Sequence, residues 1–277
     1  MNKNKLKYLC SLVSKKFDID YNSIRKLFYL EEILKRIAKS KYRNNFIFKG
    51  GMLFSNIIGI ENRRTVDIDF SLKGIESNEK NLKIVFNEIL LIKNDEINFI
   101  FNDIQPIKTD LNYPCYRFKF RASLENEKED IVLDIGVGDK IFPKPIEYSY
   151  KSFFKDESFQ VLSYTLETYF SEKLFAIISK GEANTRLKDY YDLHFLILNC
   201  KKMIDKSNLG KAISITFDNR NEKFDIKTAK LKLLELSNFE LLDNKWKKYL
   251  IKNEFTLNIT FKNLVLMIVE FLTEIFE

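Results

Sequence analysis

The feature that most constrains this chain is a glycine pair followed, sixteen residues later, by two aspartates in an alternating pattern. The apolar run 45–49 predicts a short strand that ends at Gly50-Gly51, and residues 52–58 predict a short helix. In 65–71 the apolar residues alternate with Asp67 and Asp69, which is the period-2 pattern of a strand. A strand, a helix and a second strand in such close succession require a fold that mixes helices with a sheet.

The spacing of the two aspartates favours metal chemistry. Asp67 and Asp69 lie on the same face of the predicted strand, with Cα atoms ~6.5 Å apart. Paired carboxylates of this kind suit Mg²⁺ or Mn²⁺ together with substrate phosphates, and two such ions can activate a hydroxyl and neutralise a triphosphate. Gly50-Gly51 opens a helix, where backbone N–H groups favour anions. A turn and a solvated strand face are the common alternatives for either motif alone; the conjunction favours the site.

A third acid would complete a two-metal site. Asp134 interrupts the apolar strand-like run 131–135, and burying a carboxylate there is costly unless a partner compensates it. Asp134 is therefore the preferred candidate. Asp130, on the same face, and Asp139, just beyond the strand, are weaker ones.

The remaining pattern predicts an α+β fold in two domains. Residues 1–43 and 78–93 have helical periodicity, two strands are expected at 116–122 and 130–137, and the pattern is helical from 165 onward. Only 8 glycines and 4 prolines in 277 residues disfavour a turn-rich all-β fold. We expect a mixed-sheet α/β domain with flanking helices at 1–150. A mainly helical domain that completes the active site is expected at 151–277.

Charge and cysteine content narrow the cellular context. The net charge of +7 suits a polyanionic partner, although Lys, Asn and Ile are abundant throughout, as a biased genome composition would also produce. Cys10, Cys115 and Cys200 form neither a CxxC pair nor a disulfide framework. No apolar window is long enough to span a membrane. A cytoplasmic protein without membrane association is expected.

Four segments together resemble the AbiEii/AbiGii toxin family, the nucleotidyltransferase-like proteins of type IV toxin–antitoxin and phage-defence systems. The matching segments are Lys49-Gly50-Gly51, 64–70, 133–135 and the stretch 171–193, with Glu172-Lys173-Leu174 and Arg186-Leu187-Lys188-Asp189. The resemblance implies a DNA-polymerase-β-like core that transfers a nucleotide from an NTP, with Mg²⁺, to RNA, with the tRNA 3′ end as the expected acceptor. It also implies a cognate antitoxin encoded nearby; it indicates nothing about oligomeric state.

The resemblance also implies a role for individual residues. Asp67, Asp69 and Asp134 would hold the metals, with Asp134 orienting the acceptor hydroxyl and Asp189 as a further catalytic acid. The residues that would bind the nucleotide are Lys49, Gly50, Gly51, Arg64, Lys173, Arg186 and Lys188. Met52 stands where the family commonly has Ser or Thr, so phosphate would rely on backbone amides and on nearby basic side chains.

Alternatives remain open from the sequence. The same chemistry could nucleotidylate a protein or a small molecule, and a catalytically silent protein that binds nucleotide or RNA is a third possibility. For Arg186 and Asp192, an ion-pair network that docks one helix on another is the structural alternative.

Overall fold

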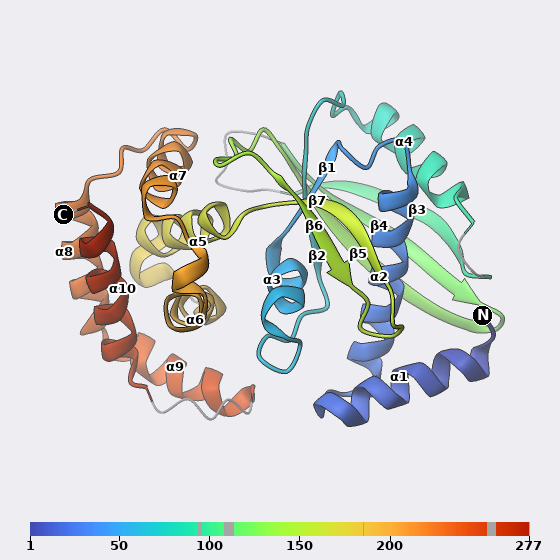
Figure 1. Cartoon of the computed structure of the whole chain (residues 1–277), viewed down its shortest axis with the longest axis horizontal. Helices are drawn as coiled ribbons and strands as arrows, with labels where there is room; N and C mark the ends of the chain where they lie inside the picture. Colours follow the sequence, from blue (N-terminus) through green and yellow to red (C-terminus); the bar gives the residue numbers. More distant parts are fainter. Residues whose placement is uncertain (94–95, 108–113, 185, 254–258, 277) are drawn as a thin grey trace. The chain divides into compact units, whose positions relative to one another are not determined.

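The computed structural model describes residues 1–93, 96–107, 114–184, 186–253 and 259–276. The chain forms two compact units (Figure 1). The first contains Met1–Asp139 and Pro145–Tyr164, and the second contains Lys140–Lys144 and Thr165–Glu277. We call them the sheet unit and the helical unit.

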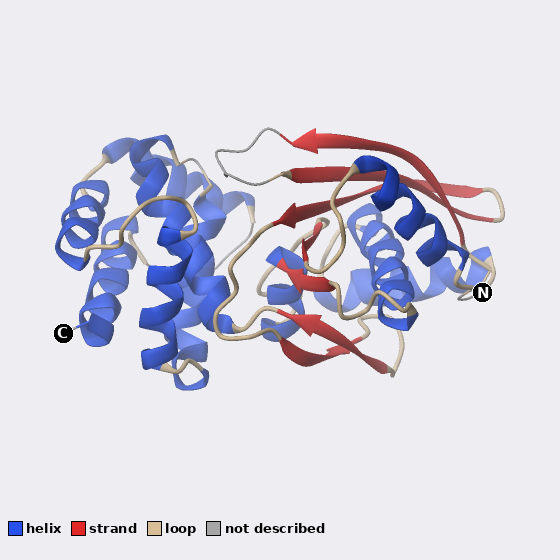
Figure 2. Cartoon of the chain, turned by 90° about the horizontal axis from the view of Figure 1, so that it is seen from above, coloured by secondary structure: helices blue, strands red, loops and turns tan. Residues whose placement is uncertain are grey.

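A seven-stranded sheet, in the order β3-β4-β5-β2-β1-β7-β6, forms the centre of the sheet unit. Neighbouring strands are antiparallel except for β2 with β5 and β1 with β7, which are parallel. The strands are β1 (Phe46–Lys49), β2 (Ile68–Leu72), β3 (Asn98–Ile107), β4 (Cys115–Leu124), β5 (Glu127–Val137), β6 (Ile146–Lys151) and β7 (Ser158–Ser163). The predicted α+β fold with a mixed sheet is confirmed, and Figure 2 shows its strands in red and the helices in blue.

Four helices belong to this unit: α1 (Lys3–Phe17), α2 (Tyr21–Lys39), α3 (Gly50–Ile58) and α4 (Glu79–Leu91). The side chain of Asp20 accepts a hydrogen bond from the backbone N–H of Ser23, so Asp20 is the N-cap of α2. Helix α3 begins directly at the end of β1, so the chain passes from strand to helix at the glycine pair.

Alternation along β4 separates the core from the open face of the sheet. Phe118 and Phe120 are fully buried and contact Phe86 of α4, with ring centroids 4.4 and 5.3 Å apart. Arg117 and Arg121 alternate with them and are about half exposed, at 47% and 48%. The aromatic side chains therefore fix which face of the sheet is left for polar chemistry.

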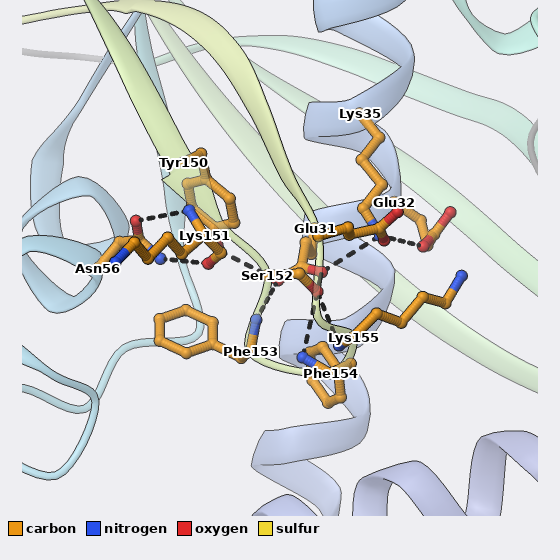
Figure 3. Close-up of polar contacts among 11 residues, drawn as sticks. Glu31, Glu32, Lys35, Asn56, Tyr150, Lys151, Ser152, Phe153, Phe154 and Lys155 are labelled. Carbon is orange, nitrogen blue, oxygen red and sulfur yellow. Dashed lines mark hydrogen bonds and ion pairs between the residues drawn. The ribbon is translucent and has the colours of Figure 1, made fainter.

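A buried polar network attaches α2 to the turn between β6 and β7 (Figure 3). The carboxylate of Glu31 accepts hydrogen bonds from the Ser152 hydroxyl and from the backbone N–H of Phe153. Lys35 lies 3.3 Å from Glu31 and 2.6 Å from Glu157. Burial works to lower the pKa of Lys35, but the surrounding carboxylates outweigh it and raise that pKa above its usual value. Each charge in this network thus depends on its neighbours.

The helical unit consists, in its described part, of α5 (Leu166–Lys180), α6 (Leu187–Phe195), α7 (Lys206–Asp218), α8 (Ile226–Ser237), α9 (Glu240–Lys252) and α10 (Phe261–Phe276), with short turns between them. Aromatic contacts join α5 to α10 through Phe170 and Phe271, and α6 to α10 through Tyr190 and Phe261. Trp246 is buried and donates to the carbonyl of Ile259, so it serves packing. No helix among the described residues is long and apolar enough to cross a membrane.

The fold differs from the sequence expectation in two respects. Strand β2 begins at Ile68, so Asp67 lies just before it, whereas the alternation predicted a strand from residue 65. The sheet also includes strands that the sequence analysis did not predict: β3, which pairs with β4, and β6 and β7, because β7 pairs with β1 at Phe48 and Ser163. The two units therefore divide at 164/165, beyond the expected 150/151.

Candidate active site

A row of polar residues crosses the open face of the sheet. The strand register pairs Lys49 with Asp69, Asp69 with Asp134, Asp134 with Arg117, and Arg117 with Gln105. These residues come from β1, β2, β5, β4 and β3, respectively. The row brings together two of the predicted acids, Asp69 and Asp134, as direct neighbours on parallel strands, with a cation on either side.

Asp69 owes its position to the first glycine of the pair. Gly50 has φ +75°, and a Cβ atom at this residue would lie 2.0 Å from Oδ2 of Asp69. A Cβ at Gly51 would lie 3.0 Å from the hydroxyl oxygen of Thr65. The glycine pair is therefore needed to admit the Asp69 carboxylate and the segment that leads to Asp67, whether or not it also receives a phosphate.

Asp134 is held by an arginine that the sequence analysis did not assign to the site. The Nε and Nη2 atoms of Arg117 donate to the two carboxylate oxygens of Asp134 at 2.8 and 2.7 Å. These hydrogen bonds and the charge of Asp134, followed by the charges of Asp67 and Asp69, raise the pKa of Arg117. All three predicted acids thus act on a single guanidinium group. The alternation in β4 could have placed Arg117 on the open face, but only the register shows its partner.

Lys49, which is predicted to bind the nucleotide, lies beside Asp139 and Tyr164. Its Nζ lies 2.5 Å from Oδ2 of Asp139 and 3.3 Å from the hydroxyl oxygen of Tyr164. The Tyr164 hydroxyl also donates to Asp139 at 2.8 Å. Asp139, the weaker candidate for a catalytic acid, is therefore an ion-pair partner of Lys49, and Asp130 pairs likewise with Arg121.

Arg64 joins the segment 63–67, which leads to Asp67, to the N-terminal helix α1. Its Nη2 donates to the backbone carbonyl of Asp18, the C-cap of α1, at 3.1 Å. Arg63 is buried and donates to the backbone carbonyl of Arg64. The segment 63–67 that precedes β2 is thus tied to α1 through Arg64, and the Ser55 hydroxyl of α3 donates to the backbone carbonyl of Arg63.

The other predicted residues lie in the helical unit, where they form their own cluster. Lys173 of α5 lies 2.7 Å from Asp189 and 3.2 Å from Asp192, both of α6. The Tyr169 hydroxyl donates to Asp192 at 2.8 Å, and the Nε atom of Arg186 lies 3.9 Å from Asp189. Asp189 and Asp192 are buried, so this ion-pair network joins α5 to α6; Lys188 is half-buried on the same helix. Their predicted roles in nucleotide binding and catalysis stay predictions.

The donor set of the row suits a hard cation. In the described part of the chain, no three acidic, cysteine or histidine residues are grouped closely enough to hold a metal ion. Asp67 and Asp69 nevertheless supply carboxylates from positions two residues apart, and Mg²⁺ usually needs only one or two carboxylates besides phosphate and water. Asp134 is paired with Arg117, and its predicted role as a metal ligand stays a prediction.

Two solved structures resemble the whole chain. JHP933 from Helicobacter pylori is 17% identical with a TM-score of 0.54, and the match covers 92% of each chain. A second H. pylori protein, assigned as a nucleotidyltransferase, is 16% identical with a TM-score of 0.52, covering 93% of this chain and 96% of that one. At these identities the matches establish the fold. No curated protein is significantly similar in sequence.

The sequence itself identifies the family. Residues 32–265 match the family described as nucleotidyl transferase AbiEii toxin, type IV TA system. This range includes every predicted site residue in both units. The chain belongs to the AbiEii family of nucleotidyltransferase toxins of type IV toxin–antitoxin systems.

Proposed function

We propose that this toxin transfers a nucleotide from an NTP to RNA, with the 3′ end of tRNA as acceptor, in a reaction that depends on Mg²⁺ or Mn²⁺. The observation that carries the proposal is the pairing of Asp69 with Asp134 on parallel strands, with Asp67 next to them. Asp69 and Asp134 are the acids of the polar row, Asp134 is held by Arg117, and the charges of Asp67 and Asp69 also act on that guanidinium; we assign the meeting of a cation-bound triphosphate and an acceptor hydroxyl to this acidic part.

The chemistry assigned to the acids is charge neutralisation and proton transfer. Asp67 and Asp69 would hold the metal ion, which supplies positive charge to the triphosphate and lowers the pKa of the acceptor hydroxyl. Asp134 accepts the proton of that hydroxyl. The hydroxyl oxygen bonds to the α-phosphorus, the bond to the β-phosphate oxygen breaks, and pyrophosphate leaves.

Arg117 fits this scheme as a positioning residue. Its two hydrogen bonds fix the carboxylate of Asp134 across the sheet from Asp69. Such a fork holds a carboxylate in one orientation more firmly than a lysine could. Asp134 is thereby oriented before any substrate arrives.

Binding of the triphosphate is assigned to the beginning of α3. Gly50 and Gly51 are its first residues, so their N–H groups have no partner within the helix and favour anions. Lys49, which is paired with Asp139, directly precedes α3, and Arg64 follows its end in the sequence. As an AbiEii toxin the protein has a cognate antitoxin, and we place its reaction in the cytoplasm, where NTPs and tRNA are found.

The test is transfer of label from each of four labelled NTPs to unfractionated bacterial tRNA, with Mg²⁺ present. Asp69→Asn should abolish transfer. Asp130→Asn is the matched control, because Asp130 is also a strand acid held by an arginine but lies outside the polar row.

Each outcome decides between the alternatives. Label in RNA that disappears in Asp69→Asn but persists in Asp130→Asn supports the proposal. Label in protein or in a small molecule instead of RNA would show that the acceptor is not RNA. Equal absence of transfer in the wild type and both variants would contradict the proposal and leave a nucleotide-binding or RNA-binding protein.

A further inference from the structure

Helix α1 is the charged α-helix, among those described, that contains lysines but no acidic residue. Its fifteen residues include Lys3, Lys5, Lys7, Lys15 and Lys16 and no acid. Every other charged α-helix in the described part of the chain mixes lysine or arginine with aspartate or glutamate. A general bias towards lysine would raise the lysine content of all helices alike, but it would not remove the acids from one of them, so it does not account for the absence of acids in α1.

The exposed side of α1 carries more than charge. Leu6, Cys10 and Val13 face the core, whereas the opposite side presents Lys5, Tyr8, Leu12, Lys15 and Lys16, all exposed. Their spacing places them on a single stripe of the helix, which we call the lysine face. Tyr8 is 63% exposed and Leu12 48%.

The C-terminal end of the lysine face is joined to the segment 63–67, which precedes Asp67. Lys15 and Lys16 lie in the last turn of α1, and Arg64 donates to the carbonyl of its C-cap residue, Asp18. Arg64 stands three residues before Asp67. Figure 1 shows α1 along one border of the sheet unit, and the Arg64 hydrogen bond joins its C-terminal end to the segment that leads to Asp67. The basic last turn of α1 is therefore joined to the segment before Asp67 through Arg64, within one unit, and the exposed acids Asp18 and Asp20 stand at the same junction.

We propose that the lysine face of α1 binds the RNA acceptor and directs its end toward Asp67 and Asp69. Lysines spaced along a helix match the spaced phosphates of a nucleic acid backbone, and an exposed tyrosine between them offers a stacking surface for an unpaired base. An anionic membrane would favour a broader apolar face than one tyrosine and one leucine supply. The inference rests on the proposed function for its choice of RNA as partner, since Arg64 joins the end of the lysine face to the segment that leads to Asp67.

The experiment measures binding of fluorescein-labelled unfractionated tRNA by fluorescence anisotropy, without NTP, over a range of salt concentrations. The test variant is Lys5→Ala/Lys15→Ala/Lys16→Ala. The matched control, Lys211→Ala/Lys232→Ala/Lys248→Ala, removes the same charge from exposed lysines of the helical unit. Thermal unfolding checks that both variants fold.

The test variant should bind at least tenfold more weakly, and its slope of log K against log salt should be smaller by about 2, since each phosphate contact contributes about 0.7–0.9. The control should keep the slope of the wild type. Tyr8→Ala should weaken binding about tenfold with the slope unchanged. Tyr8→Phe should bind like the wild type, because stacking needs only the ring.

Equal losses in the test and control variants would overturn the proposal, because binding would then depend on total charge alone. Wild-type affinity in the test variant would overturn it as well. So would binding to phosphatidylserine vesicles that requires the three lysines while tRNA binding does not. Asp69→Asn separates this inference from the proposed function. If it binds tRNA normally and the wild type transfers no label, the lysine face stands and the catalytic proposal falls. If the wild type transfers label while the test variant binds tRNA normally, the reverse holds.

Discussion

Replacing Gly50 by alanine tests whether the glycine pair exists to place Asp69. The added Cβ would lie 2.0 Å from Oδ2, 2.7 Å from Cγ and 2.8 Å from Cβ of Asp69. Ordinary contacts begin at 3.4 Å, so the carboxylate oxygen has to move by about 1.4 Å, the difference between 3.4 and 2.0 Å. In addition, φ at this residue is +75°, where an L-side chain is strained.

These two effects have different sizes and different consequences. The backbone strain should cost about 1–2 kcal/mol in the free energy of unfolding. A misplacement of about 1 Å at a reacting group commonly lowers the rate about 10²-fold. Gly50→Ala should therefore reduce stability modestly and nucleotide transfer about a hundredfold.

Gly74→Ala is the matched control, because Gly74 lies in the same unit with φ +71°. Its added Cβ would approach only the Nδ2 atom of Asn45, at 3.3 Å, so the substitution introduces the same strain without touching Asp69. Urea unfolding measures stability, and the initial rate of label transfer from NTP measures activity. Equal loss of activity in the two variants, or none in Gly50→Ala, would refute the claim that Gly50 positions Asp69.

Three further predictions follow from particular contacts. Arg117→Gln and Arg121→Gln each break a two-point pair of a half-exposed arginine on β4, so each should lower the free energy of urea unfolding by at most about 1 kcal/mol. Arg117→Gln alone should lower the transfer rate, tenfold or more. Equal transfer rates in the two variants would remove Arg117 from the site. Lys35→Met leaves buried carboxylates uncompensated and should lower the free energy of unfolding by about 3–5 kcal/mol. Lys39→Met, at an exposed position one turn later, should lower it by less than about 1 kcal/mol. Similar losses in the two variants would contradict the buried network. Burial lowers the pKa of His194, so the folded state disfavours its protonated form, and stability should fall by up to about 1.4 kcal/mol per pH unit as the pH drops below about 6.5. His194→Gln should flatten the unfolding free energy between pH 7 and 5.5, and an unchanged slope would show that His194 does not cause it.

The sequence was most informative for features of local structure that one short segment determines. The cap of α2 at Asp20 and the strand-to-helix passage at Gly50 depend on neighbouring residues, and both could be predicted. Asp69 could be singled out from its spacing with Asp67, and Asp134 because a carboxylate between apolar strand residues is costly. The structure adds that they are partners in the β2–β5 register.

Features that depend on distant segments could not be predicted in this way. Arg117 reaches Asp134 only through the β4–β5 register, and Lys49 meets Asp139 only when the sheet has formed. Glu31 lies in a helical pattern, where a charged residue normally indicates the solvent side, yet it is buried against the β6–β7 turn. The same long-range pairing placed the end of the sheet unit beyond its expected boundary.

The central claim is nucleotidyl transfer at the acidic part of the polar row. The most direct measurement follows two labels of one NTP in parallel reactions with tRNA, one on the α-phosphate and one on the γ-phosphate. The account predicts that the α-label enters RNA, that the γ-label leaves as pyrophosphate, and that Asp69→Asn abolishes both. Release of the γ-label as inorganic phosphate, or its appearance in RNA, would show hydrolysis or phosphoryl transfer and would contradict the account.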